Sequence, residues 1–277
     1  MTLIAQITDI HARPRGQTCY RKSETNMLLS RAVDSLLALA TQPDAVVVTG
    51  DITDQRDERE YRVAKEQLSR LPMPVFLLSG NHDNSTRMKD IFSDFAGMTD
   101  GPADRTQYST SLGDVQLIVL DSSVPGAPHG ELGAEQLAWL DQELVSSSNK
   151  AAMIALHHPP VDLGIQHMDA IKLIDGDRFG DIVSRHGHVE RIICGHLHRT
   201  IITGFAGSVL VVAPSVAHQV VLDFNDNAPA EFVFEPPAFF LHHHSPKTGM
   251  VTHQAFVNRY DGPYPFWADE GVSWPGY

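Results

Sequence analysis

The stretch VFLLSGNHDN, residues 75–84, changes from apolar to polar at Gly80. Its first half is a continuous apolar run, which is typical of a strand buried on both faces. Its second half places an amide, an imidazole and a carboxylate side by side at Asn81, His82 and Asp83. None of these three side chains adds to an apolar core, so the end of this strand indicates a functional site.

Four other apolar runs end in a similar polar cluster. The clusters are Asp9 with His11 after residues 3–7, Asp51 after 45–49, His157 with His158 after 152–156, and His196 with His198 after 190–194. In an open α/β sheet the carboxyl ends of the strands lie along one edge, where ligands bind. The five clusters are therefore predicted to converge in space.

The rest of the pattern indicates an α/β fold. Further strands are predicted over 115–120 and 208–213, and helical spacing of apolar residues predicts helices over 23–42, 57–71 and 133–147. Alternation of strands and helices is typical of α/β architecture.

The C-terminal part has a different composition. From about residue 225 we expect short antiparallel strands and then an irregular arm, which divides the chain into a main domain, 1–240, and an arm, 241–277, that caps it or makes an oligomer contact. Aromatic residues in the arm favour a subunit interface or a pocket wall, with ordinary covering of the core as the alternative. These residues are Tyr260, Tyr264, Phe266, Trp267 and Trp274.

Composition narrows the possible partners and compartment. The 277 residues include 34 acidic and 21 basic ones, a net charge of -13, so a nucleic-acid polymer is not expected as a partner. Only two cysteines occur, Cys19 and Cys194, which favours a reducing, cytoplasmic setting. The N-terminal MTLIAQITDIH looks like a strand and not a signal peptide, and no membrane association is expected.

The polar clusters have the composition of a metal centre. Oxygen and imidazole donors without thiolate suit zinc, manganese, iron or cobalt ions. Two aspartates, one asparagine and four histidines are too many donors for one ion and about right for two, and a carboxylate can bridge ions ~3.5–4 Å apart. In extended backbone, positions i and i+2 face the same way, so Asp9 with His11 and His196 with His198 can each face one site. A glycine before Asp51, Asn81 and His196 lets the chain turn sharply there.

The order of these motifs resembles a known family. DxH, GD, GNHD, HHP and GHxH, spread over residues 9–198, resemble the calcineurin-like metallophosphoesterase superfamily, and most closely its bacterial class III cyclic nucleotide phosphodiesterases and the related glycerophosphodiesterase. The likeness continues through SVAHQV, 215–220, and YDGP, 260–263. It implies a four-layer α/β/β/α sandwich with the metal site at the carboxyl ends of the strands, and a homo-oligomer.

The resemblance also assigns roles to individual residues. It implies a first metal ion held by Asp9, His11, Asp51 and His198, and a second held by Asp51, Asn81, His157 and His196. From the residues alone, His157 and His158 are equivalent, and only the resemblance favours His157. Residues expected to act on substrate are the catalytic pair His82 and Asp51, together with Asn81, His218 and Tyr20 as substrate contacts.

The expected activity is hydrolysis of small phosphodiesters, such as 3',5'-cyclic nucleotides or glycerophosphodiesters, by attack of a metal-bound hydroxide. Two divalent ions bring a charge of about +4, and two aspartates with one hydroxide reduce it to about +1, which matches a singly charged diester better than a doubly charged monoester. A phosphomonoesterase or protein phosphatase of the same superfamily is the alternative, followed by a non-catalytic scaffold.

Other histidine clusters are weaker candidates. The run His242–His244 is interpreted as a solvated edge in preference to a metal tract, and His186 and His188 as residues that cap a helix end. His167 and Asp169 lie in the loop after HHP and are candidates for the border of the pocket.

Overall fold

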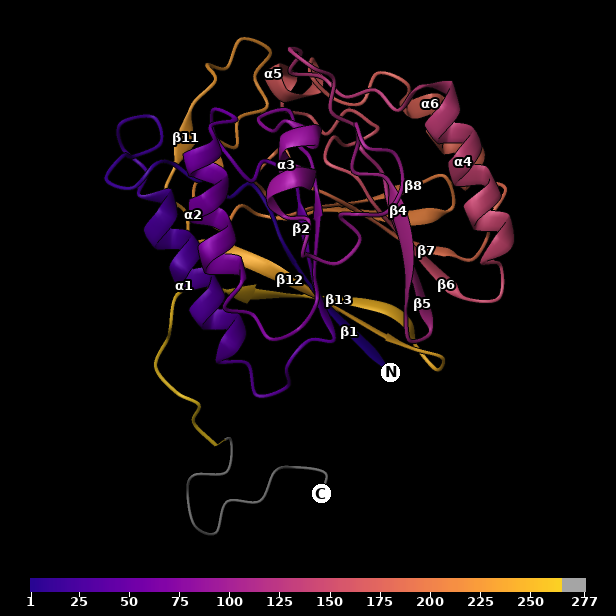
Figure 1. Ribbon diagram of the computed structural model, residues 1–277, viewed down its shortest axis with the longest axis horizontal. Helices are drawn as coiled ribbons and strands as arrows, with labels where there is room; N and C mark the ends of the chain where they lie inside the picture. The colour runs from indigo at the N-terminus through magenta and orange to yellow at the C-terminus, as the bar shows by residue number, and fades with distance from the viewer. Residues whose placement is uncertain (266–277) are drawn as a thin grey trace.

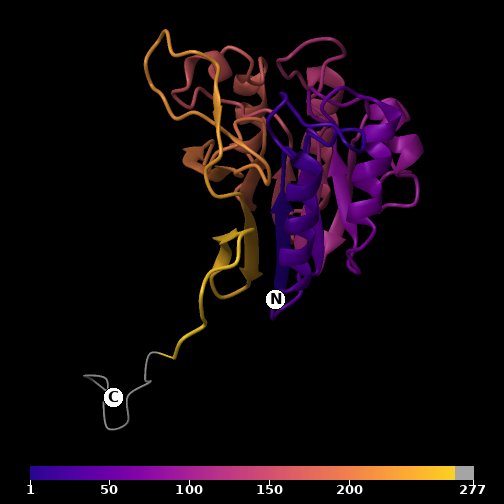
Figure 2. The ribbon, with the colours of Figure 1, turned by 90° about the vertical axis from the view of Figure 1, so that its left-hand side faces the viewer.

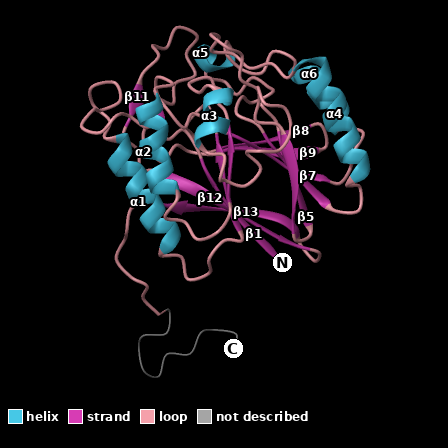
Figure 3. Ribbon diagram, in the orientation of Figure 1, coloured by secondary structure: helices cyan, strands magenta, loops and turns pink. Residues whose placement is uncertain are grey.

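The computed structural model describes residues 1–265, and it shows two β-sheets packed face to face with helices on both outer faces (Figures 1 and 3). The expected α/β/β/α sandwich is therefore confirmed. Three aromatic residues of the predicted interface, Phe266, Trp267 and Trp274, lie outside the described residues.

The first sheet has the strand order β13-β12-β1-β2-β3. Its strands are β1 (Thr2–Ile7), β2 (Ala45–Thr49), β3 (Val75–Leu78), β12 (Ala238–Ser245) and β13 (Gly249–Phe256). β1, β2 and β3 run parallel, whereas β12 pairs antiparallel with β1 and with β13. The parallel strands therefore have their carboxyl ends at one edge.

The second sheet has the order β4-β5-β6-β7-β9-β8. Its strands are β4 (Tyr108–Leu112), β5 (Val115–Val119), β6 (Ala151–Ala155), β7 (Val189–Cys194), β8 (Ile201–Phe205) and β9 (Ser208–Val212). β5, β6, β7 and β9 are parallel, and β4 and β8 form antiparallel edges. A separate two-stranded sheet joins β10 (Gln219–Val220) to β11 (Phe232–Val233).

Helices cover the outer face of each sheet. In Figure 1, α1 (Thr25–Leu37), α2 (Glu58–Leu68) and α3 (Ser85–Ile91) lie on one side, and α4 (Gly133–Ser146) and α6 (Gly176–Val183) on the other, with the short α5 (Gln166–Asp169) at the top. α2 begins with a capping box in which Asp57 and Glu60 bind each other's backbone N–H groups. Within residues 1–265, no helix combines the length and the apolar character needed to cross a membrane.

The layers explain why the predicted strands are apolar along their whole length. One core lies between the sheets and under α1 and α2, where Ile7 and Val47 meet Met153 and Ile193. A second lies under α4 and α6 around Leu140 and Phe179. Because each central strand is covered on both faces, its residues do not alternate between apolar and polar.

The C-terminal division differs from the expected one. A boundary at residue 240 falls inside β12, whose residues pair with β1 from Thr2 to Gln6. The hairpin of β12 and β13 (yellow in Figure 2) therefore extends the first sheet and is not an arm outside it. Tyr260 and Tyr264 follow this hairpin and are exposed, and neither lines the central cavity described below.

Candidate metal centre and active site

The polar clusters converge as the strand ends predict. Asp9 and His11 follow β1, Asp51 follows β2 and Asn81 follows β3 in the first sheet. His157 follows β6, and His196 and His198 follow β7, in the second sheet. Both sheets therefore contribute donors to one site at the carboxyl ends of their strands.

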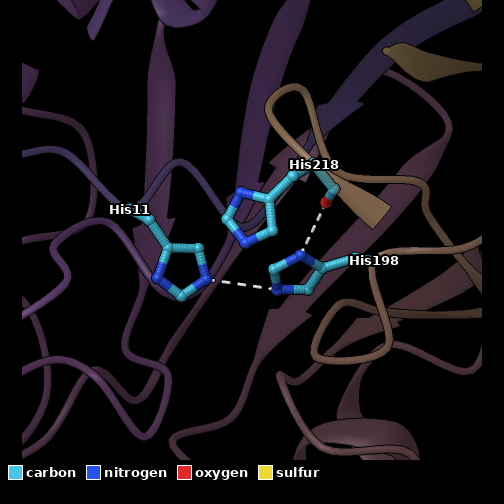
Figure 4. Close-up of side chains that lie close together, drawn as sticks. All are labelled: His11, His198 and His218. Atoms are coloured by element: carbon cyan, nitrogen blue, oxygen red, sulfur yellow. Dashed lines mark hydrogen bonds between the residues drawn. The ribbon is translucent and has the colours of Figure 1, made fainter. Parts of the chain in front are cut away.

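Four of these residues form one compact group. Asp9, His11, Asp51 and His198 each offer a ligand atom, and these atoms lie within 4.8 Å of one another. His198 Nε2 is 3.3 Å from Asp9 Oδ1 and 3.1 Å from His11 Nε2, as Figure 4 shows for the two rings. This is the set expected for the first metal ion.

A second group lies on the other side of Asp51. His157, His158 and His196 bring their ring nitrogens within 4.8 Å of one another. Asp51 Oδ2 is 3.4 Å from His157 Nε2 and 3.7 Å from His11 Nε2, so this carboxylate lies between the two groups. That position is the one a bridging ligand requires.

Hydrogen bonds to backbone carbonyls determine the histidine tautomers. His157 Nδ1 lies 2.8 Å from the Thr49 carbonyl, and His198 Nδ1 lies 2.8 Å from the His218 carbonyl (Figure 4). A carbonyl oxygen only accepts, so each Nδ1 carries the proton and each Nε2 presents a lone pair. Orientation of this kind by the other ring nitrogen is usual for metal-ligating histidines.

The donor atoms fit a metal ion because the protein leaves them unpartnered. His157 Nε2, His196 Nε2 and Asn81 Oδ1 are buried and have no hydrogen-bond partner. A buried polar atom left in this way costs about 1–3 kcal/mol. Several such atoms around one carboxylate form a donor set that bound cations would satisfy.

The backbone at the site is strained. Asp9, His11, Asp51, His196 and His198 all have φ between 46° and 72°, so five of the seven predicted ligands adopt left-handed backbone. Side chains other than glycine rarely do so, and such residues concentrate at functional sites. The i, i+2 pairs therefore face the site from tight turns beyond β1 and β7, and the explanation by extended backbone is wrong.

Two glycines show how closely the donors approach the backbone. A Cβ at Gly80 would lie 2.1 Å from Asp51 Oδ1, and one at Gly50 would lie 2.3 Å from His157 Nδ1. Gly50 also has φ of 93°, whereas Gly80 does not have positive φ. Close approach is therefore the requirement that both glycines share.

The structure distinguishes the two adjacent histidines that the residue pattern left equivalent. Both ring nitrogens of His158 are engaged, Nδ1 with Ser122 Oγ at 2.8 Å and Nε2 with the Pro128 carbonyl at 3.2 Å. His157 keeps Nε2 free beside Asp51. These contacts support His157 as the ligand and His158 as a residue that packs behind it.

Asp54 is a site residue that the sequence analysis missed. Its Oδ1 lies 3.7 Å from His11 Nδ1, and its backbone carbonyl lies 2.8 Å from His82 Nδ1. Asp54 therefore orients two site histidines from behind. Its position three residues after Asp51 was the available signal, since a turn can bring both to one site.

Asp83 connects the two loops that carry Asp51 and Asn81. Its carboxylate accepts hydrogen bonds from the backbone N–H groups of Ile52, Thr53 and Gly80 at 3.0–3.1 Å. It also accepts a hydrogen bond from Thr53 Oγ1 at 3.0 Å, so it holds the loop after Asp51 through both main-chain and side-chain contacts and the loop of Asn81 through the main chain.

The metal-free site combines ionised carboxylates with imidazoles of different charge. Burial opposes protonation of His157, but Asp51 raises the pKa of this ring to about 9. Burial also opposes protonation of His198, but Asp9 raises the pKa of that ring. These two rings therefore lose a proton when a metal ion binds.

Burial opposes ionisation of Asp51, but the charges of His157 and His82 hold its pKa well below the usual range. Burial lowers the pKa of His196 well below its ordinary value, which keeps that ring neutral. A carboxylate and a neutral imidazole are the forms that bind metal.

A cavity of about 380 Å³ opens beside these groups. It is lined by all four predicted substrate contacts, namely His82, His218, Asn81 and Tyr20. Tyr20, His218 and Phe232 form an aromatic cluster with ring centroids 5.0–5.5 Å apart. His167 also borders the cavity, whereas Asp169 binds the backbone N–H groups of residues 163 and 164 and does not line it.

The remaining histidine clusters have structural contacts. His242 and His244 are buried, so the interpretation of this run as a solvated edge is wrong for both. Their side chains alternate with that of His243 along β12 and face the second sheet, because strand residues i and i+2 share a face. The backbone N–H of His186 bonds to the Val183 carbonyl at the end of α6, as expected for a residue at a helix end, and its ring contacts Asp141 on α4 at 2.7 Å.

Comparisons with known proteins agree with this geometry. A family model described as calcineurin-like phosphoesterase matches residues 2–200. A probable glycerophosphodiester phosphodiesterase of Arcobacter nitrofigilis is 35% identical over 97% of this chain and 98% of its own length. A 3',5'-cyclic adenosine monophosphate phosphodiesterase of Vibrio vulnificus is 30% identical over 78% of this chain and 77% of its own.

Solved structures show the same fold at low identity. A dimetal phosphatase from Danio rerio aligns with a TM-score of 0.63 and 15% identity, over 93% of this chain and 99% of that one. A purple acid phosphatase from yellow lupin aligns with a TM-score of 0.64 and 14% identity, over 94% of this chain and 52% of that one. Fold, motif order and full-length similarity agree, and the chain belongs to the calcineurin-like phosphoesterase family.

Proposed function

We propose that this protein is a binuclear metal-dependent phosphodiesterase that hydrolyses small phosphodiesters, such as glycerophosphodiesters or 3',5'-cyclic nucleotides. The observation that carries the proposal is the position of Asp51 between two groups of imidazoles, one of which leaves Nε2 of His157 and of His196 without a partner. The names of the relatives, which include both kinds of phosphodiesterase, support the substrate class.

The ligand sets follow from the two groups. Asp9, His11, Asp51 and His198 would hold one ion, and Asp51, Asn81, His157 and His196 the other. When bound, such ions lower the pKa of water from about 15.7 toward about 7 and offset charge on the phosphate. Zinc, manganese, iron and cobalt all suit these nitrogen and oxygen donors.

His82 is the chain's own contribution to the reacting phosphate. Its backbone N–H donates to Asp51 Oδ1 at 2.9 Å, and Nδ1 donates to the Asp54 carbonyl at 2.8 Å. The ring is fixed by these two contacts and borders the cavity with Nε2 available to substrate. His82 is thus placed to bind a phosphate oxygen or to exchange a proton with the leaving group.

The arginines near the site favour a diester over a monoester. Arg13 is bound to Asp54 at 2.7 Å and to Glu60 at 2.8 Å. Arg199 is bound to Glu235 at 2.9 Å and to the Val220 carbonyl at 2.6 Å. Of the described residues, no arginine or lysine lines the cavity of about 380 Å³, and Arg56 borders a neighbouring space and donates to the Asn81 carbonyl at 2.6 Å, so the extra cation that a doubly charged monoester favours is missing from the first cavity.

Hydrolysis of bis(p-nitrophenyl) phosphate by metal-stripped protein tests the proposal. We expect activity to return on titration with manganese, cobalt, zinc or ferrous ions and to saturate near two ions per chain. Turnover of p-nitrophenyl phosphate under the same conditions is the control and should be slower. Faster turnover of the monoester would favour the phosphomonoesterase, and binding of ions without any turnover would favour a scaffold.

We propose further that the protein is a homo-oligomer built on a dimer. Phe256 at the end of β13 and Tyr260 and Tyr264 after it are exposed, and aromatic residues are enriched at subunit interfaces. Size-exclusion chromatography with light scattering checks this point, and a single species at the chain mass of 30.5 kDa would contradict it.

A cytoplasmic location is also proposed. Both cysteines are free and buried, as expected for a protein that folds in a reducing compartment. Cell fractionation of the native host, with a periplasmic marker as control, would test it.

A further inference from the structure

A second cavity shares two residues with the first. It has a volume of about 360 Å³, and both cavities are lined by Asn81 and His82. Its remaining walls are formed by Asp54, Gln55, Arg56, Gly126, Ala127 and Pro128. Each cavity alone is within the size range of about 300–1,000 Å³ that is usual for small-molecule sites. The phosphate-facing His82 therefore has a separate ligand-sized space on each side of the shared wall.

The two cavities differ in chemistry. Away from the metal ligands, the first is lined mainly by apolar and aromatic side chains such as Tyr20, Met168, Ile171 and Phe232, with His167 and Glu231 among its polar members. The second is instead lined by the polar residues Arg56, Gln55 and Asp54, and Gln55 Nε2 donates one hydrogen bond to Asp54 Oδ2 at 3.0 Å. An apolar group is therefore favoured in the first cavity, and a group rich in hydrogen-bond acceptors in the second.

Arg56 has hydrogen-bonding capacity to spare. Its Nη2 donates to the Asn81 carbonyl at 2.6 Å, and within residues 1–265 its side chain has no carboxylate partner. A guanidinium has five N–H donors, so most of them are available to a ligand in the cavity. This distinguishes Arg56 from Arg13 and Arg199, which are bound to carboxylates.

The backbone holds Arg56 in place. Its φ is 60°, a conformation that is rare for residues other than glycine, and its carbonyl accepts a hydrogen bond from the guanidinium of Arg87. Strained backbone persists where the surrounding contacts enforce it. The Asn81 bond and the Arg87 bond together fix the direction in which the Arg56 side chain extends.

We propose that the second cavity is an alcohol subsite, in which Arg56 and Gln55 bind the hydroxyl groups of one ester arm while the aromatic cavity takes the other arm. This inference rests on the proposed phosphodiesterase function. An acyclic diester has two separate arms and can fill both cavities around one phosphate. A 3',5'-cyclic nucleotide joins both ester oxygens to a single ribose and fills one. The substrate class is therefore an acyclic diester with a polyol arm.

A matched pair of substrates tests the subsite. The substrates are 2,3-dihydroxypropyl p-nitrophenyl phosphate and propyl p-nitrophenyl phosphate, which share a leaving group and differ only in two hydroxyls. With the manganese-loaded protein, we expect kcat/KM to be about 10-fold or more higher for the dihydroxypropyl ester, the usual effect of hydrogen bonds to a charged donor. In Arg56→Ala the ratio of the two values should fall to near one, and in Gln55→Ala it should fall partway.

The ratio is the decisive quantity because Arg56 also contacts the Asn81 backbone. Any effect of the substitution on Asn81 changes kcat/KM for both esters by the same factor and cancels in the ratio. The manganese content of the variant shows directly whether Asn81 has been disturbed. Arg59→Gln is the matched control, since it removes the same charge from a side chain paired with Asp57 outside both cavities, and it should leave the ratio unchanged.

Two results would contradict different claims. Equal kcat/KM for the two esters in the wild-type protein, or an unchanged ratio in Arg56→Ala, would overturn the subsite and leave the phosphodiesterase standing. No turnover of either ester with any of the four metals would overturn the phosphodiesterase itself, and the subsite with it.

Discussion

At the scale of single residues, Asp51 connects the two groups of histidines at the site. One carboxylate oxygen lies between His11 and His157, and the other accepts the backbone N–H of His82. A residue in this position serves both proposed ions and the loop that carries His82. Its loss should therefore affect both metal sites at once.

We predict that Asp51→Asn binds fewer than one ion per chain and loses diester turnover by at least about 100-fold, because an amide cannot bridge two cations as a carboxylate does. Metal content after dialysis, measured by mass spectrometry, checks the prediction. Asp83→Asn, which alters a carboxylate outside the ligand set, should keep more metal. Retention of two ions by Asp51→Asn would rule out the bridge.

Gly80→Ala tests the close approach of backbone and donor. The added methyl would lie 2.1 Å from Asp51 Oδ1 and 2.5 Å from the Asp51 backbone nitrogen, so the loop must move. We predict a loss of metal affinity and a fall in kcat/KM of about 10-fold or more, since small misplacements of reacting groups are costly. Gly187→Ala has open space around its Cβ and is the neutral control. Equal behaviour of the two variants in a metal titration would contradict this account.

At the scale of elements, the C-terminal hairpin is joined to the catalytic sheets by a buried polar chain. His242 on β12 bonds to Thr252 Oγ1 on β13 at 2.9 Å and to Gln6 Oε1 on β1 at 3.1 Å. The amide nitrogen of Gln6 donates in turn to the Cys194 carbonyl at the end of β7. This series of hydrogen bonds therefore runs from β13 to the second sheet. A neutral His242 takes part in it with one ring nitrogen as donor and the other as acceptor.

This buried histidine predicts a loss of stability in acid. Burial, with the nearby charge of Arg191, lowers the pKa of His242 to about 3, from 6.5 in the unfolded chain. Between pH 3 and pH 6.5 the unfolded chain binds a proton on His242 that the folded protein does not bind. The contribution of neutral His242 to the free energy of unfolding is therefore complete above about pH 6.5 and declines as pH falls toward 3.

Urea unfolding of metal-free protein checks the effect. From about pH 6 downward, the stability difference between the wild type and His242→Gln should shrink by about 1.4 kcal/mol per pH unit. Glutamine keeps a neutral donor and acceptor but does not titrate, so titration of all other groups cancels in the difference. A difference that does not change with pH would show that His242 is not buried in the neutral form.

At the scale of the whole molecule, the proposed ions connect the two sheets. Asp9, Asp51 and Asn81 come from the first sheet, whereas His157, His196 and His198 come from the second. Without cations, the unpartnered nitrogens and the buried carboxylates remain at the joint between the sheets. The metal centre should therefore contribute to stability as well as to catalysis.

Metal removal is expected to lower Tm, and the size of the effect should depend on free metal concentration. At 100-fold excess over Kd, binding to the native state alone adds about 2.7 kcal/mol, or roughly 5–10 °C for a chain of this size. Differential scanning fluorimetry with chelator and with increasing manganese measures it. Asp51→Asn is the control and should show little dependence on manganese, and an equal shift in that variant would point to binding elsewhere.

Much of the fold and of the metal site could be predicted because the evidence for both is local. All seven apolar runs became strands, and the donors follow strand ends directly in the chain, as in GNHD after β3. β4, β8 and the helices α3 and α6 were not predicted. The sequences of the edge strands β4 and β8 lack long apolar runs because these strands are only partly buried.

Other features depend on contacts between distant segments. The preference for His157 over His158 rests on hydrogen bonds to Ser122 and Pro128, and the role of Asp54 rests on contacts with His11 and His82. The left-handed turns at the ligands were also not predicted, because their strain is supported by neighbours from other strands.

The sequence by itself determined the fold class, the family and the donor set, because strand periodicity and motif order are properties of neighbouring residues. Only the tertiary structure decided that Asp54 supports His11 and His82, where the C-terminal hairpin belongs, and that two cavities of different chemistry share Asn81 and His82. Each of these depends on segments far apart in the chain, such as Arg56 and the loop at Gly126, whose contact no local pattern encodes.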